Sequence, residues 1–173
     1  MELDGFEDLV EIGRGGFGVV YRAQQATLGR EVAVKVLSTA TLSDDERRRF
    51  EREGVAMGRL SWHPNIVVVH QTGLTDDGRP YLVMEYLEGG SLGDRLRTTG
   101  PLPVPEVLDH AIALAGAIQT AHDAELLHRD IKADNALLDA FGRVKLGDFG
   151  IASVHGHTVT ATGILSGTMA HTA

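Results

Sequence analysis

HRDIKADN at residues 128–135 and DFG at residues 148–150 are the stretches that decide how this sequence folds. Each borders a short apolar run of the kind found in β-strands. The polar side chains in these stretches that could take part in a reaction are Asp130, Lys132, Asn135 and Asp148. Carboxylate and amide oxygens are ligands that magnesium prefers, and a carboxylate can also orient a hydroxyl group. The two stretches therefore predict a site suited to phosphoryl transfer.

A glycine-rich stretch, GRGGFG at residues 13–18, lies between predicted strands at 6–12 and 19–23. Glycine patterns of this form also occur in dinucleotide-binding folds, where a helix follows the turn. Here Val-Val-Tyr follows and predicts a strand instead. We therefore expect a hairpin whose bare backbone amides approach phosphates closely.

Three further strands are predicted, at 31–37, where the residues have alternating character, and at the largely apolar runs 66–69 and 81–86. A helix is expected to begin after Ser43, with Glu46 completing a capping box, and to end near Leu60. Its predicted buried stripe is Phe50, Val55, Met57 and Leu60.

Two helices are predicted in the second half, a short one from Ser91 and a long one from about 103 to 124. The apolar positions of the long helix are Val107, Ile112, Leu114, Ala115, Ile118 and Ala121.

In this order the motifs resemble those of eukaryotic-type (bacterial-like) serine/threonine protein kinases. The resemblance implies an α+β fold with a five-stranded antiparallel small lobe and one main helix, followed by the first, mostly helical part of a large lobe. It implies that residues 1–87 form the N-lobe and residues 88–173 part of the C-lobe. Gly167-Thr168 and Lys132 favour serine/threonine over tyrosine specificity.

The resemblance also implies roles for single residues. Asp130 would accept the hydroxyl proton, and Lys132 would neutralise charge on the transferred phosphoryl group. Lys35 would hold the α- and β-phosphates of ATP, with Glu53 as its acidic partner in preference to Glu51 or Glu46. Asn135 and Asp148 would hold Mg²⁺. The residues expected to contact the nucleotide are Ile12, Gly13, Gly15, Gly18, Val20, Ala33, Lys35, Met84, Glu85, Leu87 and Leu137.

Within that set, Met84 would stand at the back of the adenine pocket, and the backbone of Glu85 and Leu87 would bond the base. His128 and Phe149 would stack with Met57 and Val69, so we expect His128 to be structural rather than a catalytic base. Arg129 would receive a phosphate from the loop that follows. The candidate acceptors in that loop are Thr158, Thr160, Thr162 and Ser166, with Thr160 or Thr162 preferred.

Composition narrows the functional classes. The net charge of −8 argues against a nucleic-acid partner, and the absence of cysteine excludes disulfides. No apolar run reaches the roughly 20 residues of a membrane span, so a cytoplasmic location is expected. The sequence says nothing about a membrane anchor beyond residue 173.

The chain ends at Ala173, before the Ala-Pro-Glu motif and the helices that follow it in the family. We expect it to be a piece of a longer kinase or a truncated reading frame, and residues 1–173 alone to be inactive. The expected partners are a protein substrate with a Ser or Thr hydroxyl and a second copy for autophosphorylation. Two alternatives stay open: a truncated, non-catalytic ATP-binding or scaffold module, and a small-molecule phosphotransferase of kinase-like fold.

Overall fold

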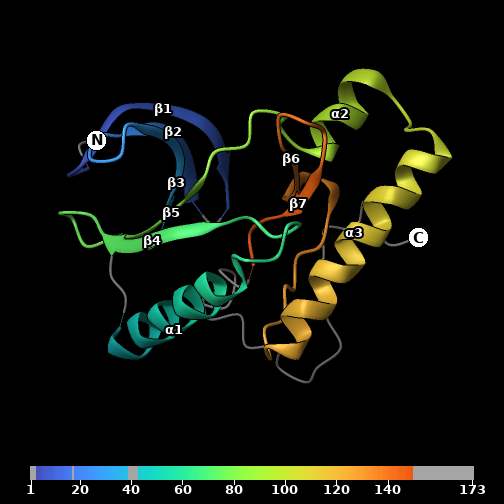
Figure 1. Cartoon of the computed structure of the whole chain (residues 1–173). Helices are drawn as coiled ribbons and strands as arrows, with labels where there is room; N and C mark the ends of the chain where they lie inside the picture. Colours follow the sequence, from blue (N-terminus) through green and yellow to red (C-terminus); the bar gives the residue numbers. More distant parts are fainter. Residues whose placement is uncertain (1–2, 17, 39–42, 150–173) are drawn as a thin grey trace.

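The computed structural model describes residues 3–16, 18–38 and 43–149. Figure 1 shows a curved sheet with one helix beneath it, followed by a mostly helical part. The sheet part contains β1 (Phe6–Gly15), β2 (Gly18–Gln25), β3 (Arg30–Leu37), α1 (Asp44–Leu60), β4 (Val69–Leu74) and β5 (Pro80–Glu85). The second part contains α2 (Leu92–Thr99), α3 (Val104–Asp123), η1 (Ala133–Asn135), β6 (Ala136–Leu138) and β7 (Val144–Leu146).

The five strands form one antiparallel sheet in the order β1-β2-β3-β5-β4. With α1 as its main helix, this small lobe confirms the predicted α+β fold. The predicted division of the chain after residue 87 falls between β5 and α2 and stays a prediction. None of the helices in the described ranges is long and apolar enough to cross a bilayer.

The central strand β3 is buried on both faces. Val32, Val34 and Val36 pack with Tyr81 and Val83 on the face turned away from α1. Because side chains alternate along a strand, the residues between them point to the opposite face. There Ala33 and Leu37 pack with the buried residues of α1, and Lys35 stands between them. The β3 sequence thus places one lysine inside an otherwise apolar layer.

Helix α1 begins with the predicted capping box. The Ser43 amide donates to the Glu46 carboxylate at 2.8 Å, and the Glu46 amide donates to the Ser43 hydroxyl at 3.4 Å. Phe50, Met57 and Leu60 are buried as expected, but Val55 is 58% exposed, so its place in the stripe was wrong.

Gly54 is the position that α1 buries in place of Val55. A Cβ added there would come within 2.7 Å of the Thr72 methyl group on β4. The glycine therefore lets the helix approach the sheet closely, which offsets its poor helix propensity.

Residues 66–68 were wrongly predicted as part of a strand of the sheet; β4 begins only at Val69. The Val67 amide donates to the Leu146 carbonyl at 3.0 Å, and the Leu146 amide donates to the Asn65 carbonyl at 2.8 Å. This segment is apolar and buried because it pairs with β7 of the second part, not because it extends the sheet. It ties the two parts together.

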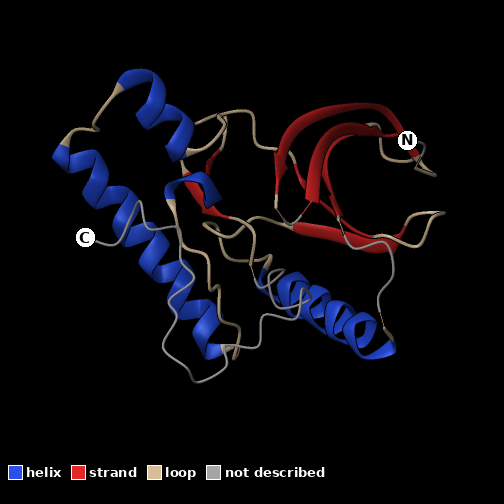
Figure 2. Ribbon diagram, turned by 180° about the vertical axis from the view of Figure 1, so that it is seen from behind, coloured by secondary structure: helices blue, strands red, loops and turns tan. Residues whose placement is uncertain are grey.

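Helix α3 lies on the far side of β6 and β7 from the sheet in both views (Figures 1 and 2). Ala121 is buried as predicted, and Leu114 and Ile118 pack against the main core. Val107 and Ile112 are 46% and 72% exposed, and Ala115 is exposed too, so the predicted stripe holds only for Leu114, Ile118 and Ala121.

Candidate active site

The loop that follows α3 presents Asp130 in a fixed setting. The Lys132 ammonium donates to the Asp130 carboxylate at 2.7 Å, and the Asn135 amide donates to the same oxygen at 3.0 Å. Asn135 also donates to the Asp130 backbone carbonyl at 2.7 Å. Three of the residues singled out from the sequence therefore meet at one carboxylate, 33% of whose side chain is exposed.

Two opposing influences act on the pKa of Asp130. Burial raises it, whereas the hydrogen bonds from Lys132 and Asn135 and the Lys132 charge lower it and prevail, so the pKa lies below its usual range. Asp130 is thus ionised at neutral pH and can accept a proton.

His128 supports this loop from beneath. Its Nδ1 accepts a hydrogen bond from the Asp130 amide at 3.3 Å, so its Nε2 carries the proton and donates to the Gly147 carbonyl at 2.6 Å. Burial lowers the pKa of His128, which keeps the ring neutral. The ring also stacks on Phe149 with centroids 4.7 Å apart. Because both ring nitrogens make hydrogen bonds, His128 has the structural role that was expected.

The backbone is strained at two points of the site. Arg129 has φ 65° and Asp148 has φ 59°, in the left-handed region that non-glycine residues seldom adopt. Such positions cost on the order of 1–3 kcal/mol each and persist only where the surroundings fix them. Here the bonds of His128 to its neighbours hold both turns, one before Asp130 and one after Gly147.

Lys35 reaches across from β3 to the second part. Its ammonium lies 2.8 Å from the Asp148 carboxylate, and the lysine side chain is 8% exposed. No ion pair joins Lys35 to Glu53 among the described residues, so the pairing predicted from the sequence is not the one adopted here. The carboxylate at the end of β7 outcompetes the one on α1 for the ammonium.

Asn135 and Asp148, the residues expected to hold a cation, differ in what their side-chain oxygens already contact: Asp148 pairs with Lys35. Because Asn135 uses its NH₂ group on Asp130, its side-chain oxygen is left for another donor or a metal. The Gly147 amide donates to the Asn135 carbonyl at 2.9 Å, which holds η1 next to the residue preceding Asp148. Amide and carboxylate oxygens form the hard donor set that suits Mg²⁺.

The residues predicted to enclose adenine lie against one apolar cluster. Ala33 and Met84 are buried members of it. Val20, Leu87 and Leu137 pack on it from β2, the segment after β5, and β6. The Glu85 amide donates to the Val68 carbonyl at 3.0 Å, so that N–H is already engaged within the small lobe.

The glycine hairpin joins β1 and β2 as predicted, but its glycines differ. A Cβ at Gly18 would lie 2.2 Å from the Val36 carbonyl, so this position needs glycine for packing against β3. A Cβ at Gly13 or Gly15 would meet nothing within 4 Å. Ile12, at the start of the turn, is 48% exposed.

One ion pair was not predicted from the sequence. The Lys145 ammonium on β7 donates to both Glu85 oxygens, at 2.7 and 2.8 Å. The Val68 amide donates to the same carboxylate at 2.8 Å. Only the backbone of Glu85 was predicted to matter, yet its side chain links β5 to the second part. The residues lie 60 positions apart, and no local pattern announces such a pair.

Several sequence predictions lie outside the described residues. These are Gly150, the phosphate acceptors Thr158, Thr160, Thr162 and Ser166, and Gly167-Thr168.

The comparisons with known proteins agree on one family. The model of the family described as "Protein kinase domain" matches residues 6–173. The serine/threonine-protein kinase PknK of Mycobacterium tuberculosis is 52% identical over 169 residues, which cover 98% of this chain and 15% of that protein. The serine/threonine-protein kinase PrkC of Bacillus subtilis is 40% identical over 166 residues, covering 95% of this chain and 25% of that protein.

A solved structure agrees with these matches. The crystal structure of the M. tuberculosis PknI kinase domain superposes with a TM-score of 0.74 at 39% identity, covering 87% of this chain and 60% of that one. The chain spans less than two thirds of these relatives. Fold, motifs and relatives agree that the chain belongs to the protein kinase family, among its serine/threonine members of the bacterial type.

Proposed function

We propose that this chain is the nucleotide-binding and catalytic part of a serine/threonine protein kinase. It transfers the γ-phosphoryl group of ATP to a Ser or Thr hydroxyl of a protein. In that step the hydroxyl oxygen forms a bond to the γ-phosphorus, the bond between that phosphorus and the β,γ-bridging oxygen breaks, and ADP leaves. The hydroxyl proton passes to Asp130.

The observation that carries the proposal is the setting of Asp130. Its carboxylate is ionised and held by Lys132 and Asn135 rather than buried in a closed ion pair. Because one third of its side chain remains exposed, a substrate hydroxyl can approach it. Lys132, bonded to the same carboxylate, is positioned to offset negative charge on the group in transfer.

ATP and Mg²⁺ are the cofactors that the family uses, and the chain offers a place for each. The apolar cluster of Ala33, Met84 and Leu137 supports adenine, and Lys35 supports the phosphates. Asn135 and Asp148 would hold Mg²⁺, which would neutralise negative charge on the phosphates. Glu53 keeps its proposed role as a second acidic partner for Lys35 when nucleotide displaces the lysine from Asp148.

Phosphorylation within residues 158–166, with Thr160 or Thr162 preferred and Arg129 as receiver, belongs to the same proposal. So do autophosphorylation between two copies and a cytoplasmic location, which the cysteine-free composition supports.

The test is phosphoryl transfer from γ-³²P-labelled ATP by the full-length protein to a panel of protein substrates, followed by phosphoamino-acid analysis. We expect labelled phosphoserine or phosphothreonine with wild type and a loss of label with Asp130→Asn. Asp109→Asn, an exposed position on α3, is the matched control. Equal labelling by wild type and Asp130→Asn would refute the role of Asp130.

The same assay separates the two alternatives. Tight binding of Mg·ATP without any transfer would indicate a scaffold module. Transfer to aminoglycosides or other small alcohols, but not to proteins, would indicate a small-molecule phosphotransferase.

A further inference from the structure

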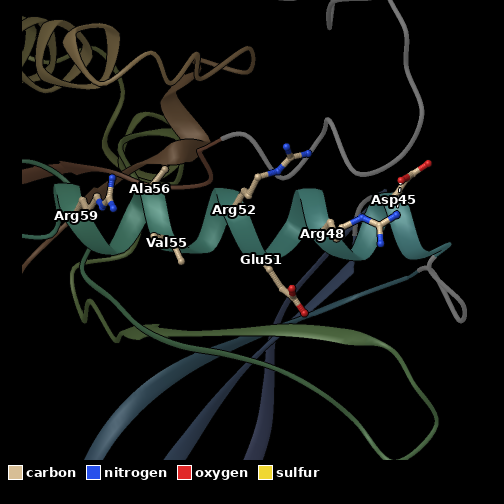
Figure 3. Close-up of a pocket in the computed structure, with 7 residues that line it drawn as sticks. All are labelled: Asp45, Arg48, Glu51, Arg52, Val55, Ala56 and Arg59. Carbon is tan, nitrogen blue, oxygen red and sulfur yellow. Dashed lines mark hydrogen bonds and ion pairs between the residues drawn. The ribbon is translucent and has the colours of Figure 1, made fainter.

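Arg48, Arg52 and Arg59 project from the face of α1 that points away from the sheet (Figure 3). With their neighbours they line an open hollow of about 670 Å³. Within the described ranges, neither Arg52 nor Arg59 has an ion-pair partner. Arg48 lies 2.7 Å from Asp45, but that carboxylate is 93% exposed, and such pairs contribute little. We call these three residues the arginine face.

The helix geometry makes the arginine face a row. Positions 48, 52 and 59 differ by about one and two helical turns, so they share one side of α1. At 1.5 Å per residue the row is about 16 Å long. Such a row fits a partner with several negative charges spread along a comparable length, rather than a single small anion.

A matching set of charges lies elsewhere on the same chain. Asp4, Glu7, Asp8 and Asp76 line a second hollow, of about 520 Å³, where the start of β1 meets the turn between β4 and β5. All four are exposed, and none has an ion-pair partner among the described residues. Asp4 lies in the turn that precedes β1, which the Phe6 amide closes by donating to the Leu3 carbonyl at 3.0 Å. We call these residues the acidic end.

We propose that the arginine face of one copy binds the acidic end of a second copy. Arg52 and Arg59 on one patch and the four carboxylates on the other have no ion-pair partner within the described residues, so the two patches are complementary in charge. Each copy has a net charge of −8, but at physiological salt charges beyond about 8 Å are largely screened, so the facing charges decide the contact.

The contact joins two different patches, so it is asymmetric. One copy receives on α1 and the other donates its acidic end, which leaves the first acidic end and the second arginine face free for further copies. α1 also carries Glu53 and packs Met57 into the core beside Phe149. A partner bound to α1 therefore contacts the same helix that carries Glu53 and Met57. This consequence rests on the proposed kinase function and gives its autophosphorylation a defined partner surface.

The experiment is sedimentation velocity of the full-length protein without nucleotide, at low and physiological salt. Face variant Arg52→Glu/Arg59→Glu and end variant Asp4→Lys/Glu7→Lys each reverse one patch. Asp109→Lys/Asp123→Lys on α3 is the matched control. We expect wild type and control to self-associate reversibly, and each patch variant to raise the dissociation constant at least tenfold.

Two combinations make the test specific. A mixture of face and end variants should regain association, because the intact acidic end of the first matches the intact arginine face of the second and the two reversed patches match each other. The variant with all four substitutions should regain association, because the reversed patches match again. A monomeric wild type up to about 1 mM at physiological salt would overturn the proposal, as would patch variants that behave like the control. Asp130→Asn should associate like wild type, so loss of activity and loss of association can be told apart.

Discussion

The catalytic loop at 128–135 and the glycine hairpin at 12–18 are both proposed to contact the phosphates of ATP, yet the structure holds them in different ways. In the loop, Asp130 is bonded through its backbone and its side chain, and Asn135 is buried. In the hairpin, Gly13 and Gly15 are exposed and have open space where a side chain would stand.

This difference agrees with the role proposed for each region. Proton transfer needs donor and acceptor atoms in fixed positions, so its groups are held before the substrate arrives. A cover over phosphates has to open for nucleotide exchange and close afterwards, so it gains from freedom to move. Substitutions in either region should therefore affect different properties of the protein.

Asp130→Asn should have the largest effect. It leaves a similar shape with similar hydrogen bonds but removes the proton acceptor, so the rate of transfer should fall by roughly 10²- to 10⁴-fold. Steady-state kinetics with a peptide substrate measure this. Thermal denaturation should show little change, since the loop keeps its Lys132 and Asn135 contacts. A variant that retains activity would place the proton acceptor elsewhere.

Lys35→Met should reduce transfer by on the order of 10²-fold, because a donor to the phosphates is lost. Lys145→Met is the informative counterpart, since it also removes a mostly buried, ion-paired lysine but one that lies on Glu85. Breaking that pair should cost about 3 kcal/mol of unfolding free energy. Chemical denaturation and kinetics on both variants give the test. Similar profiles for the two would remove the distinction between a phosphate-binding lysine and one that links the two parts.

Gly18→Ala and Gly13→Ala compare a packed and an open position within the hairpin. The added methyl group at Gly18 would meet the Val36 carbonyl, so we expect a loss of about 1–3 kcal/mol from overpacking. The methyl group at Gly13 meets nothing, so stability should change little. Urea denaturation of both variants measures the difference. Equal losses would mean that the hairpin is more tightly packed than its open glycines indicate.

The smallest expected effect is on pH dependence. Burial holds the pKa of His128 below the ordinary value of 6.5, so the unfolded chain binds a proton more readily than the folded one. The stability that follows is present above pH 6.5 and is lost as the pH falls below it. His128→Gln should flatten the decline of Tm with falling pH, whereas the exposed His122→Gln should not. Parallel declines in wild type and His128→Gln would argue against a buried neutral ring.

The features that could be predicted from the sequence depend on local interactions, and those that could not depend on contacts between distant residues. The capping box of α1 and the alternation along β3 are local signals, and both were read correctly. Residues 66–68 carry the same apolar signal as a sheet strand but pair with β7, a partner that periodicity cannot reveal. The choice of Gly54 over Val55 on the buried face depends on close packing against Thr72. Lys35 to Asp148 and Glu85 to Lys145 are long-range charge pairs, which nothing local in the sequence specifies.

Hydrogen–deuterium exchange with and without Mg·ATP tests the comparison most directly. The account predicts that the bonded amides of Asp130, Asn135 and Gly147 are protected before nucleotide binds and change little afterwards. It predicts that the turn between β1 and β2 exchanges quickly in the free protein and gains protection with Mg·ATP. Fast exchange across 128–135 that slows only when nucleotide binds would contradict the claim that the catalytic groups are held in place beforehand.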